Sequence, residues 1–219
     1  MTPDYETAAL KATQILTTRR ISSAPVSPMP ILKAIPNVMV VSYSEVALRT
    51  GIAREHAVQI FGESNQDAAT AVVRDGDRLH YFVTYNQRLP FYLLQRALAR
   101  ELGHIVLGHD GSRPDDVRTE EALTFARHLM CPRPLIRAIQ DAGIRLTTEV
   151  FGTITGCYER CIAGIQKTPG VHIPGIANII VRGQFEDYVR DFVQFQAIAQ
   201  EEDRSPLVDL GTYMDYYEE

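Results

Sequence analysis

Residues 89–109 read LPFYLLQRALARELGHIVLGH. Apolar residues recur in this stretch at intervals of three and four, which predicts an amphipathic helix. The apolar stripe consists of Phe91, Leu94, Leu98, Leu102 and Ile105. The opposite side is also largely apolar, so the helix should be buried, yet it carries Arg100, Glu101 and His104 close together. Because buried ionisable groups are costly unless they are paired or bind a metal, the helix should contain either a salt-bridge network or a chemical site.

Three short motifs follow one another in the chain. Arg-Glu-Leu-Gly-His occupies 100–104, Glu-Ala-Leu-Thr-Phe-Ala occupies 121–126, and Leu-Met-Cys-Pro occupies 129–132. Their order resembles the ImmA/IrrE family of zincin-like metallopeptidases, whose pattern is roughly H-E-L-G-H, then E-A-(N/D)-x-F-A, then L-(L/M)-x-P. The resemblance covers about residues 30–165. One departure is Leu123, where the family usually has Asn or Asp.

The resemblance implies zincin roles for specific residues. In a zincin, two imidazoles four residues apart on a helix converge on one Zn²⁺, and the intervening Glu deprotonates the metal-bound water. It implies Glu101 as the general base, with His104 and Glu121 as metal ligands. Helical spacing also favours Glu121 over Glu120 as the inward acid. The first ligand His is replaced by Arg100, whose guanidinium has no lone pair for zinc.

Two other histidines are alternatives for the missing ligand. His109 follows His104 by five residues, which turns it off the site face of a continuous helix, and His128 lies roughly 10 Å along its helix from Glu121. Either would need an unusual backbone, so we interpret His109 as a capping or surface group and His128 as a partly buried side chain. A nucleophilic pair of Cys131 and His104 is a further alternative that no other sequence feature supports.

The simplest hypothesis is that Arg100 replaces the metal. Its fixed positive charge would lie near Glu101 and Glu121, and a bidentate arginine–carboxylate bond satisfies both groups. This ion pair would brace the two helices that zinc joins in the family. The zincin-like scaffold would then fold without a metal.

Composition argues against several classes of protein. The 219 residues are 45% hydrophobic and 22% charged, as in ordinary soluble globular proteins. No apolar run reaches the roughly 18 residues of a membrane span, and the acidic N-terminus lacks a signal-peptide core. The three cysteines, Cys131, Cys157 and Cys161, form no disulfide or zinc-knuckle pattern, which predicts a cytoplasmic protein. The net charge of −5 argues against nucleic-acid binding.

Periodicity and turn residues predict the remaining elements. Helices are expected at 5–18, at 44–61 with a break at Gly51, at 117–130, at 135–142, and at 185–200 with Tyr188, Val189, Phe192 and Ile198 facing inward. Strands are expected at 38–42, 71–74 and 79–85, the last two joined by a tight turn at 75–77. The proline-rich residues 22–36 predict a linker or an extended arm. Helices at 147–151 and 156–166, with a turn at 152–155, predict a helix-turn-helix-like pair without the basic stripe of a DNA reader.

Together these features predict an α+β fold. We expect a zincin-like core with a small antiparallel sheet, two site helices and additional helices at both ends. The expected domains are an N-terminal helix and linker in 1–36, an ImmA/IrrE-type domain with the helix-turn-helix-like pair in 37–168, and a C-terminal helix and acidic tail in 169–219. An edge strand of the sheet would offer backbone groups that can hold an extended peptide in the substrate groove.

Two functions follow from the resemblance. The family's activities imply site-specific proteolysis of repressor-type regulators, often in mobile elements or stress responses. An active chain would therefore be a zinc-dependent endopeptidase with Glu101 as its base. Because Arg100 removes a ligand, we prefer a non-catalytic relative that binds a regulatory protein or peptide in the former substrate groove without a metal. A purely structural component is a third class.

Overall fold

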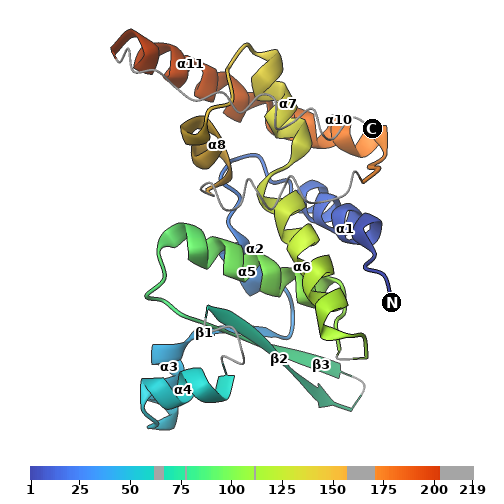
Figure 1. Ribbon diagram of the computed structural model, residues 1–219, viewed down its shortest axis with the longest axis vertical. Helices are drawn as coiled ribbons and strands as arrows, with labels where there is room; N and C mark the ends of the chain where they lie inside the picture. Colours follow the sequence, from blue (N-terminus) through green and yellow to red (C-terminus); the bar gives the residue numbers. More distant parts are fainter. Residues whose placement is uncertain (62–66, 77, 111, 157–170, 203–219) are drawn as a thin grey trace. The chain divides into compact units, whose positions relative to one another are not determined.

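The computed structural model describes residues 1–61, 67–76, 78–110, 112–156 and 171–202. The chain divides into two compact units, Met1–Pro3 with Ser27–Ala126 and Asp4–Val26 with Arg127–Glu219. The first unit contains α2 (Pro28–Lys33), β1 (Val38–Ser42), α3 (Tyr43–Thr50), α4 (Arg54–Phe61), β2 (Ala68–Asp75), β3 (Arg78–Tyr85) and α5 (Phe91–Val106) (Figure 1). The second contains α1 (Tyr5–Thr18), α7 (Arg133–Asp141), α8 (Thr148–Thr155), α10 (Gly175–Gln184) and α11 (Glu186–Glu202), and α6 (Asp115–Met130) begins in the first unit and ends in the second. The protein is therefore of mixed α+β class, as the sequence predicts.

The first unit is built on a three-stranded sheet with the order β1-β3-β2. β2 and β3 form the predicted antiparallel hairpin, with Asp75 opposite Arg78 across the turn that contains Gly76. β1, however, pairs with β3 in parallel, with Val38 opposite Tyr81. The expectation of a purely antiparallel sheet is therefore wrong. Parallel pairing is possible because α3, α4 and β2 lie between the two strands and give the chain enough length to cross over.

Helices contact both faces of this sheet (Figure 1). On one face α5 packs against β2 and β3, and α2 packs against both α5 and β1. On the other face Val41 of β1 forms a buried cluster with Val46 of α3 and Ala57 of α4. Side chains alternate between the two faces of a strand, so each strand contributes to both of these cores. This places α5 directly above β2, where the candidate site lies.

The segment after β1 forms two short helices, with the predicted break at Gly51. The Ser42 hydroxyl accepts a hydrogen bond from the backbone N–H of Glu45 at 3.1 Å, which caps the start of α3. Gly51 ends α3 with a φ of +73°, a conformation that favours glycine. Local capping signals therefore fix both ends of α3.

The proline-rich residues 22–36 are not a plain linker, because they contain α2. Pro28 is the first residue of this helix, where the backbone N–H would have no partner inside the helix in any case. Ile31 and Leu32 are buried, so tertiary packing stabilises a helix of only 6 residues. The prolines that suggest an extended arm are thus compatible with a helix start.

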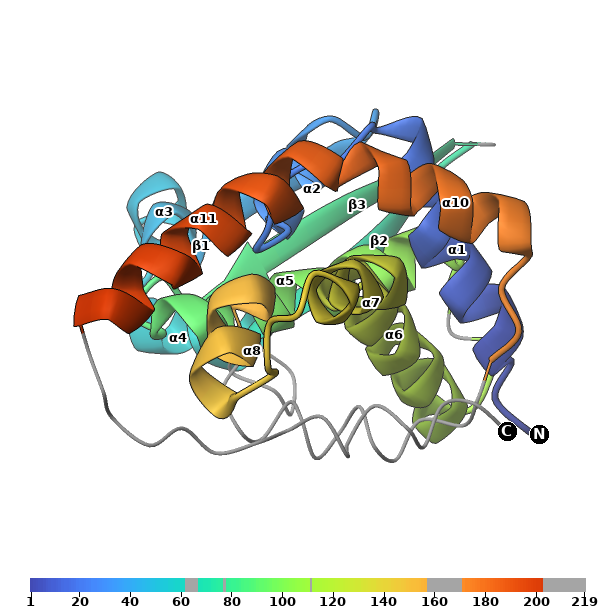
Figure 2. The same cartoon turned by 90° about the horizontal axis from the view of Figure 1, so that it is seen from above.

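The second unit is helical in the ranges that the structure describes. α1 has the predicted bounds, and it packs against α10, which also packs against α7 (Figures 1 and 2). Ala8, Ala12 and Leu16 of α1 are buried. The side chain of Gln184, at the end of α10, donates a hydrogen bond to the carbonyl of Leu16 at 3.3 Å.

Two expectations for the second unit are wrong. α8 continues through the expected turn at 152–155 and ends at Gly156, whose φ is +66°, because left-handed glycine stops a helix more strongly than the internal Gly152 does. Most of the expected second helix, 156–166, lies outside the described residues. In α11 Phe192 is buried as predicted, but Ile198 is 59% exposed. Amphipathic spacing indicates which face of a helix is apolar, but it does not indicate how much of the helix length is covered by packed neighbouring elements.

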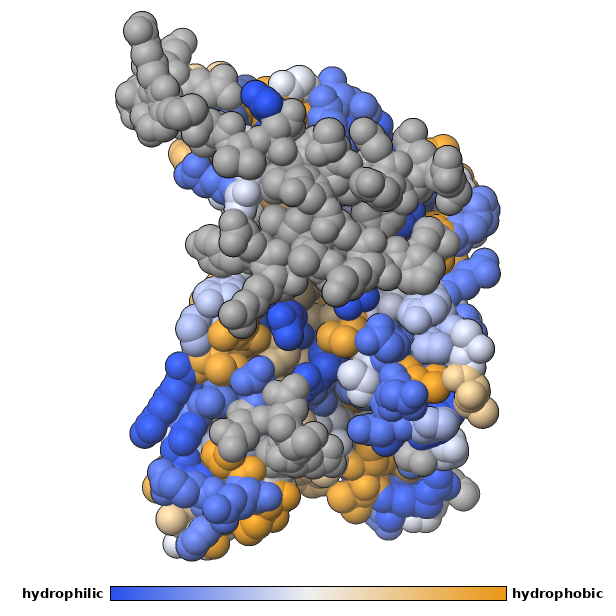
Figure 3. All heavy atoms as spheres, viewed as in Figure 1, coloured by the Kyte–Doolittle hydropathy of each residue, from blue (hydrophilic) through white to orange (hydrophobic). Residues whose placement is uncertain are grey.

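None of the helices in the described ranges is long and apolar enough to cross a membrane. Apolar side chains nevertheless reach the surface among hydrophilic ones, as the face drawn in Figure 3 shows. On β2, Val72 and Val73 are 39% and 48% exposed. The distal half of this edge strand is therefore open to solvent on both of its faces.

Candidate functional site

Helix α5 carries Arg100, Glu101 and His104 within two turns, but it ends earlier than the sequence predicts. It begins at Phe91, after Pro90, and its last residue is Val106. Glu101 is buried, with 3% of its surface exposed, and Arg100 and His104 are half-buried. The helix thus buries charge, as the sequence predicts, and the question is how that charge is satisfied.

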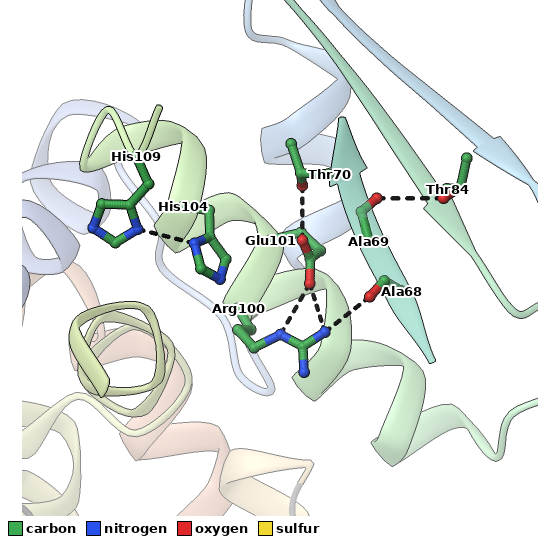
Figure 4. Close-up of polar contacts among 8 residues, drawn as sticks. All are labelled: Ala68, Ala69, Thr70, Thr84, Arg100, Glu101, His104 and His109. Atoms are coloured by element: carbon green, nitrogen blue, oxygen red, sulfur yellow. Dashed lines mark hydrogen bonds and ion pairs between the residues drawn. The ribbon is translucent and has the colours of Figure 1, made fainter. Parts of the chain in front are cut away.

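Arg100 and Glu101 form an ion pair that also holds β2 (Figure 4). The guanidinium donates from Nε and Nη2 to Oε1 of Glu101, at 2.9 and 2.7 Å. Nη2 also donates to the carbonyl oxygen of Ala68 at 2.9 Å. The other carboxylate oxygen, Oε2, accepts from the hydroxyl of Thr70 at 2.8 Å. Both oxygens of the predicted general base are therefore engaged by the chain itself.

The end of α5 brings His109 back to the site. Gly108 has a φ of +67°, its N–H donates to the carbonyl of Ile105 at 3.1 Å, and the N–H of His109 donates to the carbonyl of His104 at 3.0 Å. This is a Schellman motif, which reverses the chain and sets the residue after the glycine beside the last turn. The backbone of His109 therefore does cap the helix, but the interpretation of His109 as a surface group is wrong, because its side chain is buried.

His104, His109 and Glu121 form a hydrogen-bonded chain. Nδ1 of His104 lies 2.9 Å from Nδ1 of His109, and the two rings meet edge to face (Figure 4). Nε2 of His109 lies 3.0 Å from Oε2 of Glu121. Arg113 donates from Nη1 to Oε1 of Glu121 at 2.7 Å. The hypothesis that Arg100 pairs with both acids therefore holds for Glu101, whereas Glu121 has a cation of its own in Arg113.

The partners fix which nitrogen atoms carry protons. Glu121, paired with a guanidinium, is a hydrogen-bond acceptor, so His109 donates from Nε2 and accepts at Nδ1 from Nδ1 of His104. Burial, reinforced by His109 and Arg100, lowers the pKa of His104 to about 3. Burial also lowers the pKa of His109, against the opposing effect of Glu121. Both rings are therefore neutral at pH 7, and Nε2 of His104 has an unprotonated lone pair.

Gly103 sets the distance between α5 and α6. A Cβ atom at this position would lie 3.0 Å from the carbonyl oxygen of Ala122 and 3.1 Å from a ring carbon of Phe125. Only a residue without a side chain permits this approach of one helix to the backbone of the other. Glu121, 2% exposed, is carried into the site by the same contact. The predicted preference for Glu121 as the inward acid therefore agrees with its burial.

Residues 53–154 match the model of a peptidase family described as the IrrE N-terminal-like domain. This match agrees with the resemblance of the three sequence motifs to the ImmA/IrrE family. Neither a curated protein nor a solved structure gives a match to the chain. The IrrE-like segment contains β2, α5 and all of α6, and with them every residue of the two hydrogen-bonded groups, the one around Glu101 and the one around Glu121.

The IrrE-like site does not fit a zinc ion in the arrangement that the structure has. A catalytic zinc takes three protein ligands, and Arg100 cannot be one of them. Both nitrogens of His109 and Nδ1 of His104 are used in hydrogen bonds, and the carboxylate of Glu121 is held by His109 and Arg113. Within the described ranges, no group of three His, Cys, Asp or Glu side chains is arranged to hold a metal. Among the described residues, the Nε2 atom of His104 has no hydrogen-bond partner, so its lone pair is available.

Sequence reasoning considered His109 as an alternative ligand but set it aside, and it missed three other contributors to the IrrE-like site: Arg113, Thr70 and the carbonyl of Ala68. Gly108 followed directly by His was an available signal, because a Schellman glycine returns the next residue to the helix. The contacts of the other three join separate elements and have no local signature. His128 and Cys131 belong to the second unit, where both are buried and where burial lowers the pKa of His128 to about 4.

Proposed function

We propose that this chain is a non-catalytic relative of the zincin-like metallopeptidases, in which an internal ion pair has replaced the chemistry of the metal. The observation that carries the proposal is the state of Glu101. Its Oε1 atom accepts from Arg100 and its Oε2 atom accepts from Thr70. A general base must hold a water molecule that it deprotonates. A carboxylate whose two oxygens already accept from fixed donors, and which is 3% exposed, is poorly suited to that role.

The scaffold around this ion pair supports a zincin-like origin. α5 and α6 approach closely at Gly103 and present Glu101, His104 and Glu121 from adjacent turns. The family resemblance gives these positions the roles of base and ligands. Arg100 then braces α5 against β2, and Arg113 neutralises Glu121. Two guanidinium groups thus supply the positive charge that a zinc ion supplies in an active member.

We further propose that the outer edge of β2 binds an extended peptide segment of a regulatory protein. The N–H of Asn86 donates to the carbonyl of Asp67 at 2.9 Å, so alternate residues from Asp67 onward face β3. The backbone groups of Thr70, Val72 and Arg74 then face away from β3, toward the side on which Arg100 bonds Ala68. In the described ranges the sheet has no strand beyond β2. A peptide can add there as a further strand.

A second candidate function is the active zinc-dependent endopeptidase acting on a repressor-type protein. The Nε2 atom of His104 favours this activity, because its lone pair is available for a metal. The hydrogen bond from Nδ1 of His104 to His109, which in turn bonds Glu121, orients the ring. Metal-binding histidines are usually oriented in the same way, by a hydrogen bond to the nitrogen that does not bind the metal. For zinc to bind, Arg100 would have to break its ion pair with Glu101. Glu121 would also have to exchange its hydrogen bonds with His109 and Arg113 for a bond to the metal.

Metal content tests the first part of the proposal. We expect wild-type protein purified without chelator to contain far less than one zinc per chain, measured by elemental analysis. Arg100→His restores the first imidazole and should raise zinc affinity. Arg100→Gln is the matched control, because it removes the same charge without adding a ligand, and it should not bind zinc. One zinc per chain in the wild-type protein would contradict the proposal and favour the peptidase.

Selection from a displayed library of random peptides tests the second part. We expect the wild-type protein to enrich extended peptides with alternating apolar residues. Val72→Pro removes an outward N–H without removing a bond to β3, so it should abolish enrichment while the fold is kept. Val72→Thr is the control that retains this N–H and the β-branched shape. Equal enrichment on Val72→Pro, or none on the wild-type protein, would contradict binding at this edge.

A further inference from the structure

The outer edge of β2 is not open along its whole length, because Arg100 already binds one of its backbone groups. The residues whose backbone groups face away from β3 are Ala68, Thr70, Val72 and Arg74. The carbonyl of Ala68 accepts from Nη2 of Arg100 at 2.9 Å (Figure 4). An added strand would compete with this guanidinium at Ala68, but in the described ranges it meets no such competitor from Thr70 onward. The edge therefore offers a short pairing segment that ends at Arg100.

The outward-facing residues of this segment direct their side chains to the face of the sheet that α5 covers. The hydroxyl of Thr70 donates to Oε2 of Glu101 on α5 at 2.8 Å, which places Thr70 on that face. Because side chains alternate along a strand, Val72 and Arg74 lie on the same face. Thr70 is held by α5, whereas Val72 is 39% exposed and Arg74 is exposed as well. A bound strand would therefore contact Val72 and Arg74 on this face.

Arg74 forms no ion pair in the part of the chain that the structure describes. One acid that acts on it, Asp110, accepts a hydrogen bond at Oδ1 from the backbone N–H of Ser112 at 3.0 Å. Hydrogen bonds with Ser112 are the main cause that lowers the pKa of Asp110, and the charge of Arg74 is the smallest one. The next residue, Asp75, lies on the other face of the sheet, opposite Arg78 of β3. The guanidinium of Arg74 is therefore available to an acidic group of a ligand.

Arg74 differs in this respect from the arginines close to the two hydrogen-bonded groups. Three other guanidinium groups of the described first unit are each bonded to a carboxylate: Arg100 to Glu101, Arg113 to Glu121 and Arg118 to Asp115. An acidic ligand would have to compete with these carboxylates. The positive charge that a ligand can use without such competition lies on Arg74, at the distal end of the edge.

An antiparallel strand added to this segment would present its side chains in a defined order. Antiparallel pairing is slightly more stable than parallel pairing, and residues directly opposite each other lie on the same face with Cβ atoms about 5 Å apart. Since such a strand runs against β2, its residue opposite Arg74 precedes its residue opposite Val72 by two positions. A carboxylate at the first position can reach the guanidinium, and an apolar side chain at the second can cover Val72.

We propose that the segment bound at the β2 edge carries Asp or Glu opposite Arg74 and an apolar residue two positions later, opposite Val72. This inference rests on the peptide binding proposed above and names the chemistry of the peptide. Arg74 then selects among extended segments, and Arg100 ends the paired stretch. A pair of opposite charges on neighbouring strands gives a modest preference, about two- to fivefold in affinity.

The sequences enriched from a displayed library of random peptides separate this inference from the proposed function. We expect the wild-type protein to enrich Asp or Glu followed two positions later by an apolar residue. Enrichment of extended peptides without an acidic position would overturn this inference and leave peptide binding intact. Enrichment of the reverse order, with the apolar residue before the acid, would overturn the antiparallel register. Absence of any enrichment would contradict both the inference and peptide binding.

Reversal of one charge assigns the preference to Arg74. Arg74→Glu, at an exposed position, should switch the enriched residue from Asp or Glu to Lys or Arg and keep the apolar residue two positions later. Arg88→Glu is the matched control, because Arg88 is also exposed but follows β3 at the opposite end of the hairpin. It should keep the acidic preference. An equal change in Arg88→Glu would show general electrostatic attraction and overturn the role of Arg74.

Fluorescence anisotropy with a labelled peptide from this selection measures the size of the effect. Replacement of the acid in the peptide by its amide should weaken binding to the wild-type protein about two- to fivefold at roughly physiological salt. The same replacement should not change binding to Arg74→Gln, because the partner charge is absent. Asp110→Asn should strengthen binding of the acidic peptide, since it removes an acid that acts on Arg74. Equal losses on the wild-type protein and on Arg74→Gln would overturn the proposed pair.

Discussion

At the scale of single residues, Arg100 changes what the neighbouring acid can do. A guanidinium is a donor with a permanent charge, whereas an imidazole at the same position would offer a lone pair. Arg100 therefore turns toward acceptors, and the nearest are Glu101 and the carbonyl of Ala68. In a zincin the side chain at this position binds the metal, whereas here the Arg100 guanidinium binds the Glu101 carboxylate and a carbonyl of strand β2. One side chain thus exchanges a chemical function for a structural one.

Removal of this guanidinium should destabilise the protein. Arg100→Met is expected to lower the free energy of unfolding by about 3 kcal/mol, because the buried Glu101 carboxylate loses its cation and β2 loses a tie to α5. Denaturant titration measures the change. Arg49→Met is the control: its ion pair with Glu45 is solvent-exposed and should be worth roughly 0.5 kcal/mol or less. Similar losses in the two variants would contradict a structural role for Arg100.

At the scale of elements, the site depends on how closely two helices approach. Gly103 lets the backbone of α6 contact α5, and this contact brings Glu121 within hydrogen-bonding distance of His109. The Schellman turn at Gly108 performs the complementary step by returning His109 to the end of α5. Two glycines therefore position the chain of two imidazoles and a carboxylate, although neither has a side chain in it.

Gly103→Ala should force these helices apart. The added methyl group would lie 3.0 Å from a backbone oxygen that cannot rotate away, so we expect a loss of about 1–3 kcal/mol in the free energy of unfolding. Gly183→Ala in α10 is the matched control, since a Cβ there meets no atom within 4 Å and should stabilise its helix by about 0.5–1 kcal/mol. Thermal denaturation followed by circular dichroism measures both. A stable Gly103→Ala variant would refute the close contact.

At the scale of the whole molecule, both units bury histidines in the neutral form. His104 in the first unit has a pKa of about 3, and His128 in the second has a pKa of about 4, in each case mainly because burial disfavours the charged ring. In the unfolded chain these rings bind protons near the ordinary value of about 6.5. Between these values the unfolded state binds more protons than the folded state, so stability rises with pH.

Acidification should therefore weaken the fold well above the pH at which carboxylates titrate. The free energy of unfolding should be maximal above about pH 6.5 and fall as the pH is lowered toward 4, with each buried histidine contributing up to about 1.4 kcal/mol per pH unit. His128→Gln should flatten this dependence, and His56→Gln, at an exposed position, should not. Denaturant titrations between pH 4 and pH 8 provide the comparison. An unchanged slope in His128→Gln would contradict its burial as a neutral ring.

The sequence by itself determined the α+β class, the bounds of α1 and β1, the break at Gly51, and the placement of Arg100, Glu101, His104 and Glu121 on two helices, because periodicity, capping and turn residues act over a few positions. Only the tertiary structure decided the partners. The hydrogen bonds of Arg100 with Ala68 and of Thr70 with Glu101, the link from His109 to Glu121, and the parallel pairing of β1 with β3 each join separate elements of the chain. Such contacts depend on which faces the packed core brings together, and no local pattern specifies them.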